Sequence, residues 1–471
     1  MRLYKIFFTK ISLFSVLMLT QACSLGPDYL RPQTAIPQNY LENLGEGNPF
    51  AELGWWEIFE DPALQELIRQ ALDNNKDLLM AVARIEQAGA AFGITRADQF
   101  PRLELSGHAQ RSEASREALA FKTGPVNDFG LFSNLSYELD FWGKLRKASE
   151  AKRSELLSSQ YAALTVTMTL VSEVASAYLN ILSLQDQLNI AEQTLKNRSG
   201  ASALIKKRHE EGLIPQLDLN QAQIEEAAAG IALTESQRML RQAENNLRVL
   251  LGNPSFEIKP GSKLVDYNFG QNLPSGYPVE LLERRPDIKS AEEYAKAQVS
   301  NISVAMANRF PAINLRGMIG LQSIEDSRFF RGDARTWSIA GSLLGPIIDF
   351  GKVGSQIDLA EALAKEALLA YELKVIQAVR EVEDALIAIK TSKQAYDYRK
   401  FQVEAASNAA LLSRARYDEG VAPYMEVLDI ERSLFEAELG ASRNKELYLL
   451  SIIQLYKALG GGWQSELTLD S

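Results

Sequence analysis

The side chains best placed to do chemistry are carboxylates that follow two Gly-x-x-Pro motifs. Gly420 to Pro423 precedes Glu426 and Asp429, and Gly212 to Pro215 precedes Asp218. Residues three apart on a helix share a face, so Glu426 and Asp429 can attract cations together. Acids near a helix N-terminus also stabilise the helix dipole, and this structural role is the alternative for each of the three.

Other reactive side chains are scarce. The chain has one cysteine, Cys23, and two histidines, His108 and His209. We interpret His108 as a strand residue and His209 as a helix-end residue, since neither has the neighbours of a catalytic or metal site. No Gly-rich phosphate loop occurs, and the net charge of -10 opposes nucleic-acid binding. We therefore predict no enzymatic activity, no catalytic residue and no bound metal.

The cysteine stands at the end of an export signal. Basic residues precede an apolar run at 11–19, and the small Ala22 comes directly before Cys23. The apolar run is too short to span a bilayer. We predict a signal peptide over 1–22 and a lipoprotein whose Cys23 carries N-palmitoyl and S-diacylglycerol groups. Ordinary cleavage beside an incidental cysteine is the alternative. A lipid alone holds a chain weakly, so a resident membrane protein needs a second device.

A tandem duplication organises the rest of the chain. Residues 99–107 recur at 309–317, and residues 208–215 recur at 416–423, in each case about 210 residues later. The Asp-Phe-Trp-Gly-Lys at 140–144 and the Leu-Gly at 251–252 also have counterparts, at 349–352 and 459–460. Because the four landmarks keep one order and nearly one spacing, we predict two structural repeats.

Each repeat has the same predicted plan: a helix, two strands, a very long helix, a Gly-x-x-Pro turn and a further helix. Repeat 1 covers 62–252, with helices at 62–98, 144–210 and 216–251 and strands at about 102–111 and 131–141. Repeat 2 covers 283–460, with helices at 286–308, 354–418 and 424–459 and strands at about 312–322 and 338–349. The segments 23–61, 253–282 and 461–471 lie outside the repeats.

The long helices need partners along their whole length. About 65 residues reach ~100 Å at 1.5 Å per residue. Apolar residues recur by sevens, as in Leu164, Val171 and Tyr178, which is typical of helices packed side by side. The two shorter helices of each repeat together match the long one, so they can stack end to end beside it. The sequence predicts a long tube wall of side-by-side helices, with a soluble antiparallel bundle as the alternative.

The four predicted strands alternate apolar or small residues with polar ones over about ten residues. This pattern is typical of a transmembrane β-barrel with a wet lumen, which His108 would face. A half-buried soluble sheet explains each strand taken singly. Four strands cannot close a barrel, and open edges are not tolerated in lipid. A membrane role therefore requires several chains to share one barrel, and three chains would supply twelve strands. Phe329, Phe330 and Trp337 are candidate aromatics of the membrane interface. The alternative is that they pack between loops within the oligomer.

The whole mature chain resembles the TolC-like outer membrane factors, in particular the lipoprotein subgroup paired with RND-type efflux pumps. The resemblance rests on Cys-Ser-Leu-Gly-Pro-Asp-Tyr at 23–29, Glu-Arg-Arg-Pro-Asp-Ile at 283–288 and Leu-Tyr-Lys-Ala-Leu-Gly-Gly-Gly-Trp at 455–463. It implies a mainly α, α+β membrane protein: a homotrimer with a shared twelve-stranded outer-membrane β-barrel on a periplasmic α-barrel. An equatorial domain would comprise 23–61, 253–282 and 461–471.

The resemblance also implies a gate. Related channels close their periplasmic end with acidic residues at the positions of Glu426 and Asp429, which would form stacked rings in a trimer. Asp218 is a further candidate for the gate. Arg416 and Tyr417 could hold the tip closed, and helix-end capping is their alternative role. Ala422 stands where family members place a polar or charged group, so no locking bridge is expected from it.

The function implied is an exit duct. It would export small toxic compounds or drugs passively through the bacterial outer membrane, as a lipid-anchored trimer with a large periplasmic extension. Its expected partners are a periplasmic adaptor, an inner-membrane RND-type transporter and outer-membrane lipid. Heavy-metal efflux or type I protein secretion through the same duct is an alternative, and a periplasmic structural coiled-coil lipoprotein is the alternative without a channel. The sequence does not identify the cargo.

Overall fold

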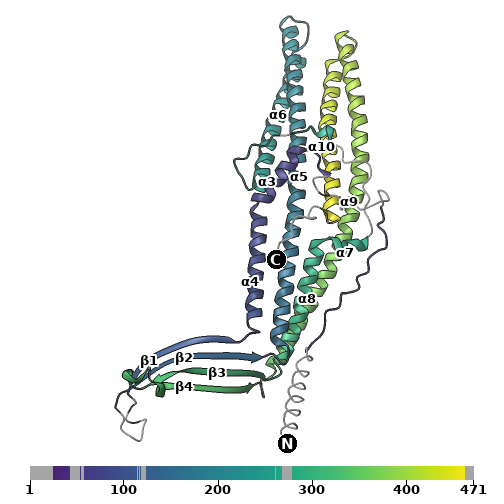
Figure 1. Cartoon of the computed structure of the whole chain (residues 1–471). Coiled ribbons are helices and arrows are strands. Elements are labelled where there is room, and N and C mark those ends of the chain that lie inside the picture. Colours follow the sequence, from purple (N-terminus) through teal and green to yellow (C-terminus); the bar gives the residue numbers. More distant parts are fainter. Residues whose placement is uncertain are drawn as a thin grey trace. The chain divides into compact units, whose positions relative to one another are not determined.

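The computed structural model in Figure 1 describes residues 25–42, 54, 58–113, 115, 117, 124–259, 261–267 and 278–461. The predicted signal peptide, Cys23 and almost all of the predicted 461–471 tail lie outside these residues. Contacts divide the chain into two compact units. Unit 1 comprises 1–33, 84–160 and 290–372, and unit 2 comprises 34–83, 161–289 and 373–471.

The elements follow the duplicated plan. Repeat 1 contains α3 (Pro62–Asn74), α4 (Lys76–Ala97), β1 (Arg102–Ser112), β2 (Val126–Leu139), α5 (Lys144–Glu210) and α6 (Gln216–Leu250). Repeat 2 contains α7 (Leu281–Arg284), α8 (Pro286–Ala307), β3 (Ala312–Ser323), β4 (Arg335–Leu344), α9 (Lys352–Asp418) and α10 (Tyr424–Ala458). Short 3-10 helices lie at Leu264–Asp266, Pro278–Glu280, Asp326–Arg328 and Gly332–Ala334.

Unit 1 contains one antiparallel sheet with the strand order β1-β2-β3-β4, so β1 and β4 are its edges (Figure 1). The register places mainly apolar side chains in rows across one face. One row contains Leu105, the small Ser133, Ile319 and Trp337. Most of this face is open: Leu105 is 74% exposed and Trp337 73%. An exposed apolar face of this extent is typical of a surface that meets lipid.

The bounds of two strands differ from the prediction. The strand expected at 131–141 begins at Val126, because 126–130 pair with the outer end of β1. The strand expected at 338–349 is shifted to Arg335–Leu344. It stops before Gly345 and Pro346, where proline lacks the N–H that a ladder needs. Gly345 also lies so close to Pro311 that an added Cβ would sit 2.7 Å from the Pro311 Cα.

The two long helices are equal in length, at 67 residues each. In α5 the heptad positions Val171 and Tyr178 are buried, and in α9 Val375 and Val382 are buried. Among the described residues, α5 is the helix long and apolar enough to cross a membrane by length and composition, but 56% of that apolar window is buried inside the protein. Its apolar character therefore serves packing against neighbouring helices.

The shorter helices meet end to end in unit 2. The helix expected over 62–98 is broken at Asn75, whose extended ψ of 130° separates α3 from α4. The Asn75 side chain donates to the carbonyl of Leu250, close to the end of α6, at 2.9 Å. Gly252 has a φ of +63°, and an added Cβ there would lie 2.3 Å from the Asn74 carbonyl oxygen. We call this contact the repeat 1 junction.

Repeat 2 has the same junction with different chemistry. The Arg285 guanidinium donates to the Ala458 carbonyl at the end of α10, at 2.9 Å, and Gly460 has a φ of +82°. We call this contact the repeat 2 junction. In both repeats the end of one shorter helix therefore meets the start of another at a junction within unit 2.

A buried hydrogen-bond cluster fixes the start of repeat 1 within unit 2. Asp61 caps α3 at the Ala63 N–H (2.8 Å) and accepts the hydroxyls of Tyr178 (2.9 Å) and Tyr267 (2.6 Å). Burial alone would raise the pKa of Asp61, but the hydrogen bonds from Tyr267, Ala63 and Tyr178 outweigh it and hold the pKa below its ordinary value. Burial raises the pKa of Tyr178 to about 12. The cluster therefore ties α3 to α5 through an ionised carboxylate.

Candidate functional site at the helix tips

The two Gly-x-x-Pro motifs reverse the chain between α5 and α6 and between α9 and α10. Gly212 and Gly420 both have a φ of +77°, a conformation that glycine adopts without strain. The N–H groups that follow close the helix ends: Leu213 donates to the Arg208 carbonyl at 2.8 Å, and Val421 donates to that of Arg416 at 2.9 Å. Pro215 and Pro423 then start α6 and α10 in an extended conformation.

An apolar cluster holds the two tips together. It contains Ile205 of α5, Leu219 and Ala222 of α6, and Tyr424, Val427 and Leu428 of α10. Tyr417, a predicted gate support, packs on this cluster, with its ring 5.1 Å from that of Tyr424. The Arg208 guanidinium lies 5.7 Å from the Tyr417 ring and 3.8 Å from Asp418, which joins the end of α5 to the end of α9. The tips are therefore one packed body.

The two predicted gate acids each have an arginine of their own. Glu426 lies 3.5 Å from the Nε of Arg416, and Asp429 lies 3.1 Å from an Nη of Arg432. The Asp429 side chain is 59% exposed, whereas that of Glu426 is 33% exposed. The arrangement is thus two ion pairs one turn apart, with the carboxylate of Asp429 the more open to solvent.

Arg432 also links the gate helix to repeat 1. Its Nε lies 3.0 Å from Glu225 of α6, as an ion pair without an aligned hydrogen bond. Arg198 of α5 forms an ion pair with the Glu225 carboxylate at 2.9 Å and donates to the Glu225 backbone carbonyl at 3.1 Å, and both side chains are nearly buried. The four residues Asp429, Arg432, Glu225 and Arg198 form what we call the charge chain. It connects α10, α6 and α5 through alternating charges, and a movement of α10 away from α6 would break it.

Glu431 is a further acid of the tips and is more buried than the two predicted gate acids. Burial raises the pKa of Glu431 above its ordinary value, and the attraction of Arg414 and Arg198 offsets only part of this effect. Arg414 lies 3.5 Å from Glu431. Burial also raises the pKa of Tyr424 to about 12. The tips therefore contain a carboxyl group that protonates more readily than a solvated one.

The remaining predicted residues have structural contacts. The N–H of Asp218 donates to the Pro215 carbonyl in the first turn of α6, a position where an acid stabilises the helix dipole. A ring nitrogen of His209 lies 3.0 Å from the Ile214 carbonyl oxygen, within the tip turn. His108, in the sheet, lies 3.0 Å from Asp128 and stacks on Phe132. In the part of the chain that the structure describes, no group of three or more metal-ligating side chains occurs.

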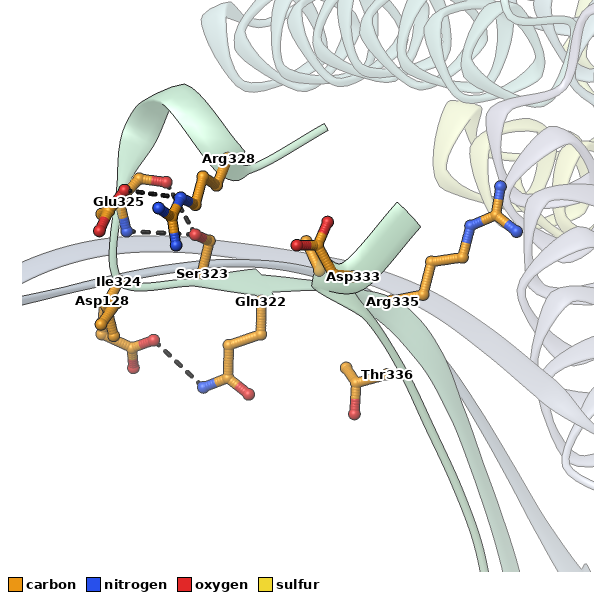
Figure 2. A pocket seen from close by; sticks show the side chains of 10 residues that line it. Asp128, Gln322, Ser323, Ile324, Glu325, Arg328, Asp333, Arg335 and Thr336 are labelled. Atoms are coloured by element: carbon orange, nitrogen blue, oxygen red, sulfur yellow. Dashed lines mark hydrogen bonds and ion pairs between the residues drawn. The ribbon is translucent and has the colours of Figure 1, made fainter. Parts of the chain in front are cut away.

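A polar pocket of 440 Å³ lies in unit 1, where β2, β3 and β4 meet the β3–β4 connection (Figure 2). Gln322 donates to Asp128 at 3.1 Å, and Arg328 pairs with Glu325 at 3.0 Å. Most of its polar groups are thus satisfied within the chain. Beside it, Phe329 and Phe330 pack edge to face, and Phe330 is 85% exposed. An exposed Phe330 is compatible with both predicted roles, at the membrane interface and in loop packing within the oligomer.

Three features define a subunit of a TolC-like outer-membrane channel. They are the four-stranded sheet with edges unpaired among the described residues and an exposed apolar face, the two long helices, and the two helix tips that carry acidic residues. The family model for outer membrane efflux proteins matches residues 67–253 and 277–461, one match for each repeat. The chain belongs to this outer membrane efflux protein family.

Curated relatives match along almost their whole length. The cation efflux system protein CusC of Escherichia coli K12 is 34% identical over 461 residues, covering 96% of this chain and 99% of the relative. The probable efflux pump outer membrane protein TtgC of Pseudomonas putida is 32% identical over 471 residues, covering 97% and 96%. The probable outer membrane lipoprotein SilC of Salmonella typhimurium is 33% identical over 463 residues, covering 96% and 98%.

Solved structures agree with the fold. A crystal structure of CusC superposes with a TM-score of 0.85 at 32% identity, covering 93% of this chain and all of that one. The open-state MtrE channel of Neisseria gonorrhoeae superposes with a TM-score of 0.86 at 29% identity, covering 94% and 99%. The resemblance, the fold class and the outer-membrane channel function predicted from the sequence are thereby confirmed.

Proposed function

We propose that three copies of this chain form an exit duct of a tripartite efflux system. A periplasmic adaptor and an inner-membrane RND-type transporter would hand cargo to it. The observation that carries the shared barrel is the sheet, whose edges β1 and β4 have no partner within the described chain. Unpaired strand edges are not tolerated in lipid, so β1 of one copy must pair with β4 of the next. Three four-stranded sheets then close one barrel.

The proposed cargo is small organic compounds that are toxic to the cell. The names of the relatives indicate both metal and organic cargo: one is a cation efflux system protein and another is a toluene efflux pump outer membrane protein. The described residues hold no cluster of metal ligands, and the eight methionines of the chain are scattered. These features favour organic cargo over heavy-metal efflux, while type I secretion remains a rival use of the same duct.

The proposed membrane anchor is the lipid on Cys23, carried as N-palmitoyl and S-diacylglycerol groups. A relative is named as a lipoprotein, and the chain just after the cysteine is held firmly. Arg31 forms two hydrogen bonds to Glu292 of α8, at 2.9 and 2.8 Å, and Tyr29 donates to the same carboxylate. Cys23→Ser should abolish incorporation of labelled palmitate, and continued labelling would contradict this assignment.

The proposed gate is formed by Glu426 and Asp429, with Asp218 as a further acid. Three copies would bring these carboxylates into stacked rings that favour cations. Arg416 and Tyr417 support the closed tip from the end of α9, and the charge chain holds α10 against α6. Opening the duct then requires α10 to leave the contacts made by Arg416 and Arg432.

Single-channel recording in a planar bilayer tests both levels of the proposal. We expect trimers that conduct ions, with cation selectivity that falls in the double variant Glu426→Gln, Asp429→Asn. Glu235→Gln, an exposed acid of α6, is the matched control. A protein that never conducts would refute the duct and favour the structural coiled-coil lipoprotein. Conducting trimers whose selectivity is unchanged in the double variant would refute the gate alone.

A further inference from the structure

The repeat 2 junction holds a guanidinium between two carboxylates. Arg285 forms a fork to Asp287 at 3.0 and 2.8 Å and reaches Glu381 of α9 at 2.7 Å. The same guanidinium donates to the Ala458 carbonyl. Lys374 lies 3.9 Å from Asp287 and adds a second positive charge. The Arg285 side chain is only 5% exposed and that of Asp287 12%, so their fork is shielded from solvent, whereas Glu381 and Lys374 lie at its open side.

The repeat 1 junction places the same backbone at the same point. The N–H of Asn75 donates to the Ala71 carbonyl at 2.8 Å, as that of Arg285 donates to the Leu281 carbonyl at 3.0 Å. Asn75 therefore corresponds to Arg285, and Asp77 corresponds to Asp287. Glu173 and Glu381 occupy the same position in α5 and α9, helices of equal length that begin at Lys144 and Lys352.

Both carboxylates are retained in repeat 1, but both cations are missing. Asn75 replaces the arginine, and Val166 stands at the position of Lys374. Among the described residues, no hydrogen bond or ion pair reaches the side chain of Asp77 or Glu173, and both are exposed. Asp77 in the first turn of α4 stabilises the helix dipole, but this role does not account for Glu173.

A cavity occupies the place of the missing guanidinium. It has a volume of 250 Å³, and its polar lining consists of Asn75, Asp77, Thr165, Thr169 and Glu173. The polar atoms of the Asn75 side chain are turned to backbone: it donates to the Leu250 carbonyl and accepts from the Leu78 N–H. The Thr165 hydroxyl donates to the Tyr161 carbonyl at 2.9 Å, and its oxygen can still accept. The two carboxylates, the Thr169 hydroxyl and this oxygen therefore offer acceptors to a ligand that donates hydrogen bonds.

We propose that this cavity binds a guanidinium group supplied from outside the chain. The planar guanidinium matches paired carboxylates better than a spherical cation does, and the repeat 2 junction shows such a group held by the corresponding residues. The group could belong to a small guanidinium compound or to an arginine of a neighbouring copy, and the chemistry of recognition is the same. The site is separate from the gate and does not require that the duct conduct.

Agmatine binding to the detergent-solubilised trimer tests the site. With two charge-assisted hydrogen bonds, a Kd on the order of 1 mM is expected by calorimetry. The double variant Asp77→Asn, Glu173→Gln should weaken binding at least about tenfold. The matched control Glu66→Gln, Asp73→Asn, on the neighbouring α3, should bind as the wild type does.

A graft fills the cavity from within. The double substitution Asn75→Arg, Lys76→Pro converts the local sequence into the Arg-Pro-Asp of repeat 2. Arginine can still donate to the Leu250 carbonyl, as Arg285 does at Ala458, and proline is well suited to the first position of α4. The graft should abolish agmatine binding and raise the Tm of the trimer by about 1–2 °C.

The two sources give different results. If agmatine binds the wild type, and the carboxylate variant weakens this binding while the graft abolishes it, the site is assigned to a small guanidinium compound. Absence of agmatine binding, together with a lower Tm of the trimer in the single variant Glu173→Gln but not in Glu66→Gln, assigns the group to a neighbouring copy. If agmatine does not bind and that variant melts like the control, the proposal is wrong.

Discussion

Replacing Arg432 with methionine should loosen the proposed gate. The substitution keeps most of the apolar stem and removes the guanidinium. Arg432 is 43% exposed and Asp429 is 59% exposed, so solvent screens their pair to about 0.5 kcal/mol. Glu225 is only 12% exposed, and its pair with Arg432 at 3.0 Å should contribute about 1 kcal/mol. The pair with Asp429 lies within α10 and moves with that helix. Only the loss of the Glu225 pair, about 1 kcal/mol, therefore shifts the equilibrium, to a roughly fivefold larger open population.

Open probability in planar bilayers measures this effect directly. Arg241→Met is the matched control, because Arg241 on α6 is 77% exposed and its ion pair among the described residues is with Glu244 of the same helix. Arg432→Lys should lie between wild type and Arg432→Met, since it keeps the charge and loses the fork. If Arg432→Met opens no more often than Arg241→Met, the charge chain does not hold the tip closed.

Three further variants test the interior. Asp61→Asn should destabilise the protein by about 2–3 kcal/mol at neutral pH. The folded pKa of Asp61 is lowered, so this stabilisation is present above the unfolded pKa of about 4 and is lost as the pH falls through the folded pKa. The melting temperatures of wild type and variant should therefore converge in acid. The folded pKa of Glu431 is raised, so its ionised carboxylate destabilises the folded protein as the pH rises above about 4.5. Glu431→Gln should therefore raise the Tm at pH 7 and leave it unchanged in acid. A higher Tm in acid alone would contradict the burial argument. Arg285→Met leaves Asp287 half-paired and should cost about 3–5 kcal/mol, seen as a loss of trimer yield and Tm, whereas an unchanged Tm would show that the junction is not stabilised by its ions.

Much of the architecture followed from local sequence signals. The limits of α5 were predicted at Lys144 and Glu210 because glycine precedes one and follows close after the other, and the structure has the same limits. The break at Asn75 was missed, because Asn-Lys-Asp carries no proline and its partner is the distant Leu250 carbonyl. The outer start of β2 was missed because its pairing with β1 overrides a weak alternating pattern.

The candidate site was predictable only in part. Glu426 and Asp429 were identified by their spacing after a turn, and they remain predictions for the gate. The arginine partners of these acids could be identified only from the fold. Arg198 and Glu225 belong to two antiparallel helices, and Arg432 belongs to the other repeat, so no periodicity along the chain brings them together.

The unpaired edges of the sheet determine how a mutant copy affects an assembly that also contains normal copies. A copy damaged along β4 still offers an intact β1, so it can enter an assembly with normal copies and leave one seam of the barrel unsealed. If half of the copies carried such a lesion and all mixed freely, only about one assembly in eight would contain three normal chains. Mutations at either edge should therefore be dominant when expressed beside the wild-type gene, whereas lesions that prevent the chain from folding should be recessive.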